Sequence, residues 1–168
     1  MKYCCAFFYD FFEVFIKMDY TQQMNELKKF VKLRLEYKVL LAEAYVTLGL
    51  SRFALMTTEF KKTAKRLGNT MQKNSAPLNE KQRLTAKKID WAVNVMSRYT
   101  FWESKCLVKA VAAKHMLNRR NLANTLYLGM AKDDQGNLQA HAWIECSDLS
   151  LTGSSTADRF TVVSSFSN

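Results

Sequence analysis

Cys106 and His141 are the residues of this sequence whose types could support covalent catalysis. A cysteine in the first turn of a helix gains thiolate character, because the helix dipole and the free backbone amides stabilise negative charge. The residues after Cys106 have a helical pattern, and Lys105 adds a nearby positive charge. The backbone amide of Cys106 could also help to bind an oxyanion. An isolated buried cysteine is usually inert, so this interpretation depends on a base for Cys106.

His141 suits that role better than His115, the other histidine of the chain. His115 lies nine residues after Cys106, which on a helix places it on the opposite face and roughly 13 Å along the axis. His141 lies in the middle of a predicted strand, and an inward-facing strand histidine beside the start of a buried helix is how unrelated thiol enzymes assemble this pair. Cys146 follows five positions later, so its side chain should point to the other face of the sheet.

The residues after position 100 must position this pair, and their pattern predicts a helix followed by strands. Ser104 can cap a helix that contains Cys106 and is apolar almost all round, as buried helices are. Three short segments rich in β-branched and aromatic residues follow, at 124–132, 139–146 and 159–166. We therefore predict an α+β core in which a central cysteine-bearing helix packs on a small antiparallel sheet.

Residues 1–100 are predicted to be helical, apart from a surface loop over residues 69–78. An amphipathic helix is expected over residues 5–18, and two helices between residues 22 and 67 should be joined or kinked near Gly49. Asn79 and Gln82 have the spacing of a capping box, which predicts a helix from there to about Tyr99. We divide the chain into a helical region, 1–100, and a core, 101–168, and expect one compact unit.

Positive charge is concentrated in the helical region. The 168-residue chain has 25 basic and 15 acidic residues, and residues 1–100 contain 18 of the basic and 9 of the acidic ones. Such a surplus suits an acidic partner, an anionic lipid surface or nucleic acid, although scattered lysines more often mark a solvated helical face. The lysines alternate with apolar helix positions and no aromatic stacking motif accompanies them, so we expect no nucleic-acid partner.

Other features predict a cytoplasmic protein without a metal or other cofactor. The four cysteines form no Cys-x-x-Cys pair, which argues against a zinc site or a disulfide framework. The longest uncharged run near a hydrophobic peak, residues 44–51, is far shorter than the roughly 20 residues of a membrane span. The first residues lack the basic region and cleavage site of a signal peptide. Contact of the basic helices with a membrane surface stays open.

Residues 101–146 resemble the transglutaminase-like protease of lasso-peptide biosynthesis, and their sequence is FWESKCLVKAVAAKHMLNRRNLANTLYLGMAKDDQGNLQAHAWIEC. The similar features are a Cys-Leu helix start, an Arg-Arg helix end, a Leu-x-x-Gly-Met strand and an Ala-His-Ala-Trp-Ile-Glu strand. The resemblance covers about residues 40–166, including a helical segment that begins at Glu43. It implies a papain/transglutaminase-like fold, with Cys106 as the nucleophile and His141 as the general base of a leader peptidase.

The third catalytic residue of that family is an aspartate twelve positions after the histidine, and here that position is Gly153. The acid orients the imidazole rather than accepting its proton, so its loss weakens catalysis without forbidding it. Glu145 lies roughly 13 Å along the same strand from His141 and is too far away to replace it. The role could pass to a backbone carbonyl, to water, or to one of three side chains, those of Asp158, Ser154 and Ser155.

The resemblance also implies partners. Members of the family either carry a fused leader-binding domain of the winged-helix type or use a separate small protein for that purpose. Residues 1–100 show no β-hairpin of such a domain, so the chain resembles the stand-alone protease half. It is expected to act on a lasso precursor peptide, at the leader–core junction, together with a separate leader-binding protein and the ATP-dependent cyclase that closes the macrolactam.

Two other functions fit part of the same pattern. An acyl transferase would use Cys106 and His141 on a different amide, and the masses of the products would separate transfer from hydrolysis. A catalytically weak or dead scaffold could bind peptide or anionic lipid through the basic helices. The glycine at position 153, where the resembled family has an aspartate, is the feature that favours the scaffold.

Overall fold

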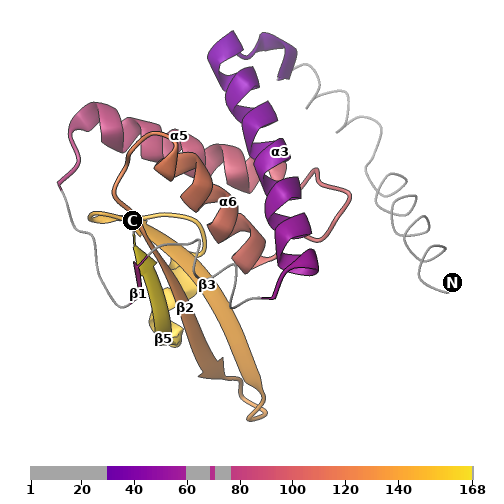
Figure 1. Ribbon diagram of the computed structural model, residues 1–168, viewed down its shortest axis with the longest axis vertical. Coiled ribbons are helices and arrows are strands. Elements are labelled where there is room, and N and C mark those ends of the chain that lie inside the picture. The colour runs from indigo at the N-terminus through magenta and orange to yellow at the C-terminus, as the bar shows by residue number, and fades with distance from the viewer. Residues whose placement is uncertain (1–29, 60–68, 71–76, 168) are drawn as a thin grey trace, which may run out of the picture. The chain divides into compact units, whose positions relative to one another are not determined.

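The computed structural model describes residues 30–59, 69–70 and 77–167 (Figure 1). Contacts divide the chain into two parts, residues 1–39 and residues 40–168, and each is described by itself. The second part contains the elements that surround Cys106 and His141. The amphipathic helix predicted over residues 5–18 lies outside the described residues, and the domain boundary predicted near residue 100 stays a prediction.

A five-stranded antiparallel sheet is formed by the described residues of the C-terminal part, in the order β1-β5-β2-β3-β4. The hairpin of β2 (Thr125–Lys132) and β3 (Leu138–Cys146) is at its centre, flanked by β5 (Thr161–Ser167) and the short β4 (Leu149–Ser150). In the hairpin, Leu128 pairs with Ala142 and Gly129 pairs with His141. Paired residues of antiparallel strands point to the same face, so this register decides which side chains accompany His141.

The remaining strand, β1 (Asn69–Thr70), was not expected, since these residues were predicted to lie in a surface loop. Asn69 pairs with Ser167 and Thr70 pairs with Phe166, at the C-terminal end of β5. Without β1, the backbone N–H and C=O groups at the edge of β5 would have no strand to pair with. A neighbouring segment can form hydrogen bonds with them whatever side chains it carries. Local sequence carries no signal for such a pairing.

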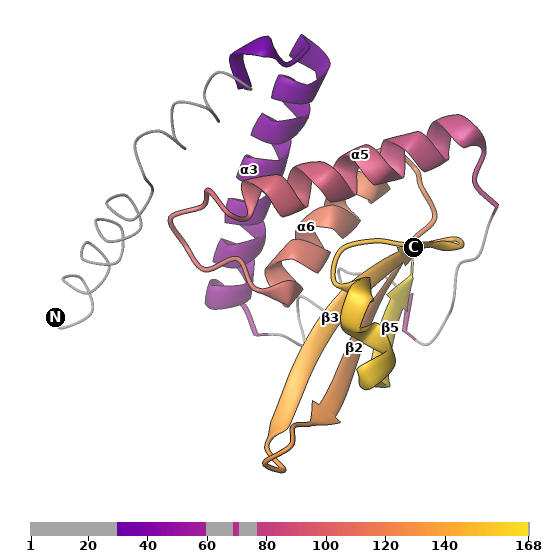
Figure 2. The same ribbon diagram turned by 180° about the vertical axis from the view of Figure 1, so that it is seen from behind.

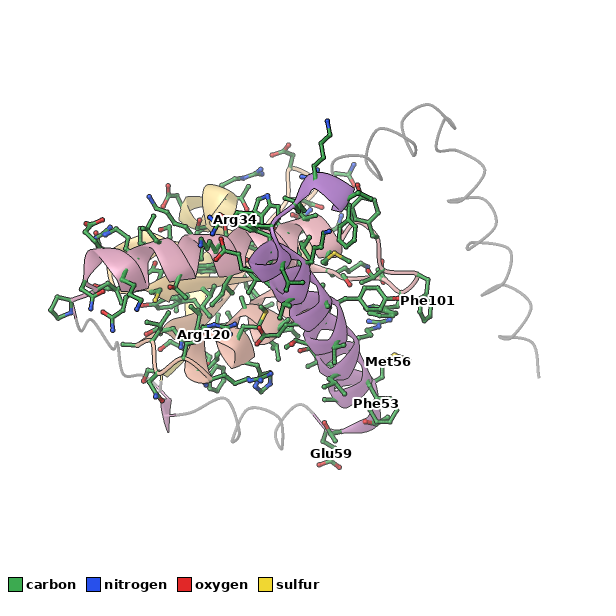
Figure 3. The ribbon with its side chains drawn as sticks, turned by 90° about the horizontal axis from the view of Figure 1, so that it is seen from above. Arg34, Phe53, Met56, Glu59, Phe101 and Arg120 are labelled. Atoms are coloured by element: carbon green, nitrogen blue, oxygen red, sulfur yellow. The ribbon has the colours of Figure 1, made fainter. Side chains whose placement is uncertain are left out.

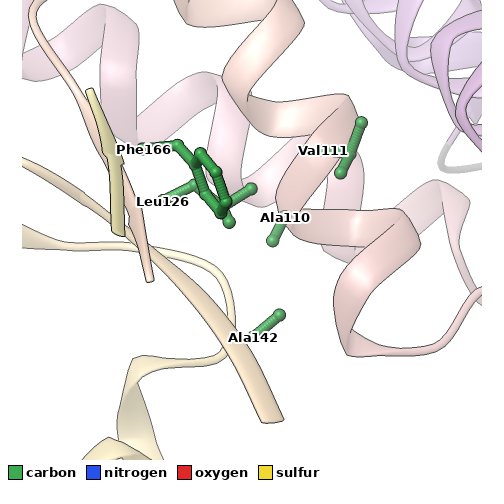
Figure 4. Close-up of a cluster of buried hydrophobic side chains, with 5 residues drawn as sticks. All are labelled: Ala110, Val111, Leu126, Ala142 and Phe166. Carbon is green, nitrogen blue, oxygen red and sulfur yellow. The ribbon is translucent and has the colours of Figure 1, made fainter. Parts of the chain in front are cut away.

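The central helix α6 (Cys106–Asn118) packs on β3 and β2, as predicted. It is buried through most of its length, and small alanines let it approach the sheet closely. A buried cluster joins the helix to all three long strands (Figure 4), and it consists of Ala110, Val111, Leu126, Ala142 and Phe166. Because Leu126 is fully buried there, its replacement by alanine would cost about 2–5 kcal/mol of unfolding free energy.

Lys114 is a fully buried charged residue on α6. Its ammonium group donates hydrogen bonds to Oδ1 of Asn124 at 3.0 Å and to the carbonyl oxygen of Phe166 at 3.1 Å. Loss of hydration lowers the pKa of Lys114 to about 8. These contacts tie the middle of α6 to the start of β2 and to the end of β5.

The helix α5 (Glu80–Met96) begins at the predicted capping box and packs on α6. Oδ1 of Asn79 accepts a hydrogen bond from the backbone amide of Gln82, and Oε1 of Gln82 accepts one from the amide of Asn79, both at 2.9 Å. These bonds satisfy two of the amides that a helix start leaves open. The helix ends at Met96, slightly before the predicted end at Tyr99.

The helix α3 (Leu35–Thr57) is a single element, so the prediction of two separate helices joined near Gly49 is wrong. Gly49 lies against the indole of Trp102, and a Cβ at position 49 would be 3.2 Å from that ring. The ring of Tyr45 lies beside the same indole, with 5.1 Å between the ring centroids. The glycine therefore allows an aromatic side chain from a distant loop to pack closely against the helix.

The outer side of α3 is apolar and exposed, and Figure 3 shows Phe53 and Met56 projecting from it. Val46, Leu50, Phe53 and Met56 are 57–69% exposed. Length and composition alone would let α3 cross a membrane, but core helices of soluble proteins meet the same criteria. The inner side packs on the rest of the fold through Leu41, Ala44 and Leu48, which are buried.

Candidate active site

Cys106 is the first residue of α6, where the helix was predicted to begin. The N-cap residue is Lys105 rather than Ser104, because the Ser104 hydroxyl forms a hydrogen bond of 2.9 Å with Oγ1 of Thr100 instead. Lys105 makes no side-chain cap, which leaves the amides of the first turn available to another acceptor. The Lys105 ammonium lies 2.9 Å from Oε1 of Glu103, so a carboxylate offsets the positive charge expected beside Cys106.

The two cysteines of the core have different surroundings. Cys106 is half-buried and packs against the cluster that contains Ala142, the neighbour of His141 on β3. Cys146 is fully buried, and its thiol donates a hydrogen bond to the carbonyl oxygen of Ala123 at 3.1 Å. Burial, with a contribution from the carboxylate of Asp148, raises the pKa of Cys146 to about 11. Cys146 is therefore a protonated core residue at neutral pH.

His141 is held by hydrogen bonds at one ring nitrogen. Nε2 lies 2.7 Å from the carbonyl oxygen of Gly153 and 3.3 Å from Oγ1 of Thr156. A carbonyl oxygen can only accept, so Nε2 carries a proton and the neutral ring keeps its lone pair on Nδ1. The imidazole also stacks on Phe160, with 4.8 Å between the ring centroids, and on Trp143, at 6.1 Å. Nδ1 is thus the atom that could accept a proton from a thiol.

Gly153 provides the acceptor through its backbone rather than through a side chain. Its φ of 86° lies in the left-handed region, and a Cβ at this position would be 2.6 Å from the carbonyl oxygen of Ala142. An aspartate cannot occupy position 153 unless the turn moves. Of the substitutes considered from the sequence that the structure describes, the backbone carbonyl is the one that contacts His141.

The side chains considered for that role lie in η1 (Ser154–Arg159), a 3₁₀ helix that follows Gly153. Asp158 is exposed, and within the described residues no hydrogen bond links it or Ser154 to His141. The side chain of Ser155 is outside the described part of the chain. Thr156 does contact the ring, and sequence reasoning missed it, since no family pattern or spacing distinguishes it from the neighbouring hydroxyl residues.

His141 and Cys106 belong to neighbouring elements but extend on different faces of the sheet. Ala142 points to α6, and side chains alternate along a strand. His141 therefore points to the other face, where Figure 2 shows η1 as the short yellow coil in front of β3 and β5. Within the described residues, no hydrogen bond joins the thiol to the imidazole.

Next to His141, β3 has no neighbouring strand on the side of β4. The register between β3 and β4 includes only Glu145 and Cys146, and two further backbone bonds connect Ile144 to Leu151 and Thr152. At His141 the neighbour of β3 on this side is therefore the turn at Gly153 rather than a strand. The catalytic pairing of Cys106 with His141 stays a prediction.

The other candidates from the sequence lie away from this region. His115 is exposed near the end of α6. Glu145 lies four positions along β3 from His141, opposite Thr125 in the register. Across the parts of the chain that the structure describes, no three His, Cys, Asp or Glu side chains are grouped so that they could hold a metal ion.

Comparison with known proteins gives one match. The profile of a family described as the transglutaminase-like superfamily matches residues 48–165. The matched segment begins within α3 and ends within β5, so it includes Cys106, His141 and Gly153. No curated protein and no solved structure matches the chain.

Proposed function

Since the chain belongs to the transglutaminase-like superfamily, whose fold is that of cysteine peptidases and acyltransferases, we propose that it is the cysteine peptidase that removes the leader from a lasso-peptide precursor. Cys106 is the proposed nucleophile and His141 the proposed base. The observation that carries the proposal is the hydrogen bond of 2.7 Å from Nε2 of His141 to the carbonyl of Gly153. The acceptor, Gly153, stands at the position where the resembled family has its orienting aspartate. Because the bond uses Nε2, Nδ1 is left to act as the base.

In the proposed reaction, the Cys106 thiolate attacks the carbonyl carbon of the peptide bond at the leader–core junction. A carbon–sulfur bond forms, and the amides of the first turn of α6 stabilise the oxyanion. His141 transfers the proton taken from the thiol to the leaving amine as the carbon–nitrogen bond breaks. Water then attacks the thioester, gives a proton to Nδ1, releases the leader with a free carboxylate and regenerates the thiol.

This reaction requires Nδ1 of His141 to reach the thiol around the edge of β3. In free enzymes, catalytic hydrogen bonds are often long or poorly aligned and shorten only in the complex with substrate. The turn at Gly153, rather than a continuous strand, borders β3 at this position. The thiol and the imidazole would have to approach each other when substrate binds, because within the described residues no hydrogen bond joins them.

The proposed partners are a separate leader-binding protein and an ATP-dependent cyclase, and the proposed location is the cytoplasm. Two features of the chain support a protein partner. Residues 1–100 have twice as many basic as acidic residues, which would attract an acidic surface. The apolar residues on the outer side of α3 form a contiguous exposed surface, and such surfaces mark sites of interaction.

The decisive experiment is incubation of the protein with a lasso precursor and its leader-binding partner, followed by mass measurement of the products. The proposal expects an intact leader with a free carboxylate, produced much faster with the partner than without it. A leader mass that includes an added nucleophile would indicate acyl transfer instead. Full activity on dilute precursor without a partner would contradict the dependence on one.

A catalytically weak or dead scaffold is the second candidate. It is favoured by the separation of the thiol and the imidazole on different faces of the sheet and by the neutral acceptor at Gly153. In that case the precursor binds but its mass does not change, with or without the partner. The same incubation therefore separates the scaffold from the peptidase.

A further inference from the structure

A carboxylate on α5 contacts the turn that holds His141. Oδ1 of Asp90 accepts a hydrogen bond of 2.7 Å from the hydroxyl of Thr152, which is 1% exposed. The same oxygen accepts a bond of 3.0 Å from the side-chain amide of Asn94, one turn further along α5. Asp90 and Thr152 are 62 residues apart in the sequence, so the bond joins two separate parts of the fold.

Thr152 is the residue before Gly153, and its backbone is fixed as well. The amide of Ile144 donates to the carbonyl oxygen of Thr152 at 3.3 Å, and the amide of Ser154 donates to the carbonyl oxygen of Leu151 at 3.0 Å. The second bond closes a four-residue turn with Gly153 in its third position, where φ of 86° and ψ of −4° are the values of a type II turn. The direction of the Gly153 carbonyl depends on this turn.

We propose that Asp90 is a positioning residue for His141 and acts through Thr152. Its carboxylate holds the Thr152 hydroxyl, the Thr152 backbone sets the turn, and the Gly153 carbonyl accepts the proton of His141 Nε2. An acid on a neighbouring helix thus supports the orientation that the resembled family obtains from an acid at position 153. This inference rests on the proposed role of His141 as the base.

Removal of the Thr152 hydroxyl is the test, with ¹⁵N NMR of the His141 ring as the main readout at a pH where the imidazole is neutral. The wild-type ring should carry its proton on Nε2. In Thr152→Val, which keeps the shape of the side chain, the ring should become a mixture of tautomers. The rate of leader release should fall by roughly 10–100-fold, the range found when a metal-bound histidine loses the hydrogen-bonded group that orients its ring. Thr152→Ser, which keeps the hydroxyl, should show the wild-type tautomer and the wild-type rate of leader release.

Thr85→Val is the control, because the Thr85 hydroxyl bonds to the carbonyl oxygen of Lys81 in its own helix, 2.8 Å away. If Thr152→Val keeps the wild-type tautomer and rate and loses only thermal stability, as a structural contact would, the positioning role is overturned. The NMR readout needs no activity. A wild-type protein that cleaves nothing would refute the proposed function, while the change of tautomer would still decide whether the contact between Asp90 and Thr152 positions His141.

Discussion

The two faces of the sheet are stabilised by different kinds of interaction. On the face toward α6, the contacts are apolar and come from a helix and three strands, with Cys106 at the border of a fully buried cluster. On the face toward η1, His141 forms hydrogen bonds with Gly153 in a turn and Thr156 in a short 3₁₀ helix. Its ring also stacks on Trp143 of β3 and on Phe160, the residue after η1. Burial of many apolar groups gives a rigid position, whereas a few hydrogen bonds at a sheet edge give an adjustable one. The nucleophile should therefore be the fixed partner and the base the movable one.

Loss of the Cys106 thiol, on the face toward α6, should have the largest effect on the rate of leader release. Cys106→Ala should reduce leader release by at least about 10³-fold, since the other groups of a catalytic unit contribute little once the nucleophile is gone. Circular dichroism should show that the fold is kept, and alkylation of the wild-type protein should be fastest at Cys106. Cys146→Ala is the control and should retain cleavage. Release at the wild-type rate by Cys106→Ala, in a preparation free of other proteases, would refute the assignment.

Loss of the imidazole should be nearly as damaging. His141→Ala removes the base, so the rate of leader release should approach that of Cys106→Ala, and the double variant should be no slower than the worse single one. His115→Ala should retain most of the activity, because His115 is exposed on another part of α6. Kinetics of the four variants measure this directly. Equal effects of His141→Ala and His115→Ala would remove His141 from the mechanism.

Substitution of Gly153 should affect both the turn and the site. Alanine there meets an unfavourable φ of 86° and a Cβ contact of 2.6 Å with the carbonyl oxygen of Ala142, so we expect a loss of about 2–4 kcal/mol of unfolding free energy and slower cleavage. Gly136→Ala is a matched control, with a φ of 83° but no atom within 4 Å of the added Cβ. Urea unfolding compares the two. An equal loss in both variants would show that strain alone, and not the contact with β3, is responsible.

The smallest predicted effect concerns Lys114, on the face toward α6. This residue should make the free energy of unfolding depend on pH. Its pKa is lowered from 10.5 to about 8 in the folded protein, so between these values the unfolded chain binds more protons at this residue. Its contribution to stability therefore rises as the pH increases from 8 to 10.5 and is lost as the pH falls towards 8. Lys114→Met should remove this part of the slope, as measured by urea midpoints at several pH values.

Lys109→Met, a change to a half-buried lysine on the same helix, is the control for that experiment. It separates the loss of a charge from α6 in general from the loss of the buried Lys114. Cys146, whose pKa is raised from 9.0 to about 11, contributes a loss of stability as the pH rises through that window. This contribution is the same in all three proteins and cancels in the comparison. An unchanged slope in Lys114→Met would show that Lys114 is not desolvated in solution.

Local patterns predict much of the fold. The capping box at Asn79, the start of α6 at Cys106 and the β2–β3 hairpin follow from residues within a few positions of each other, and the structure confirms them. The α+β architecture follows from the same signals. These features depend on hydrogen bonds and apolar periodicity within single elements, which a sequence displays directly.

Features that depend on distant residues could not be predicted. Glycine is a residue that often interrupts helices, but Gly49 lies inside α3 and packs against Trp102, which is 53 positions away. The acceptor for His141 is a carbonyl whose direction follows from the φ and ψ of Gly153, and a sequence does not specify those angles. The face on which His141 extends follows from the strand register, and a shift of β3 by one residue would turn His141 to the face toward α6.

Because the acceptor for His141 is the backbone carbonyl of Gly153, the orientation of the imidazole depends on whether the turn around Gly153 is formed. A carboxylate side chain remains an acceptor even when its loop moves, whereas a carbonyl changes direction as soon as the turn opens. Opening of the turn from Leu151 to Ser154 would therefore release the imidazole without any chemical change. Such edges open far more readily than the core. The proportion of molecules with an oriented base would then equal the proportion with a closed turn.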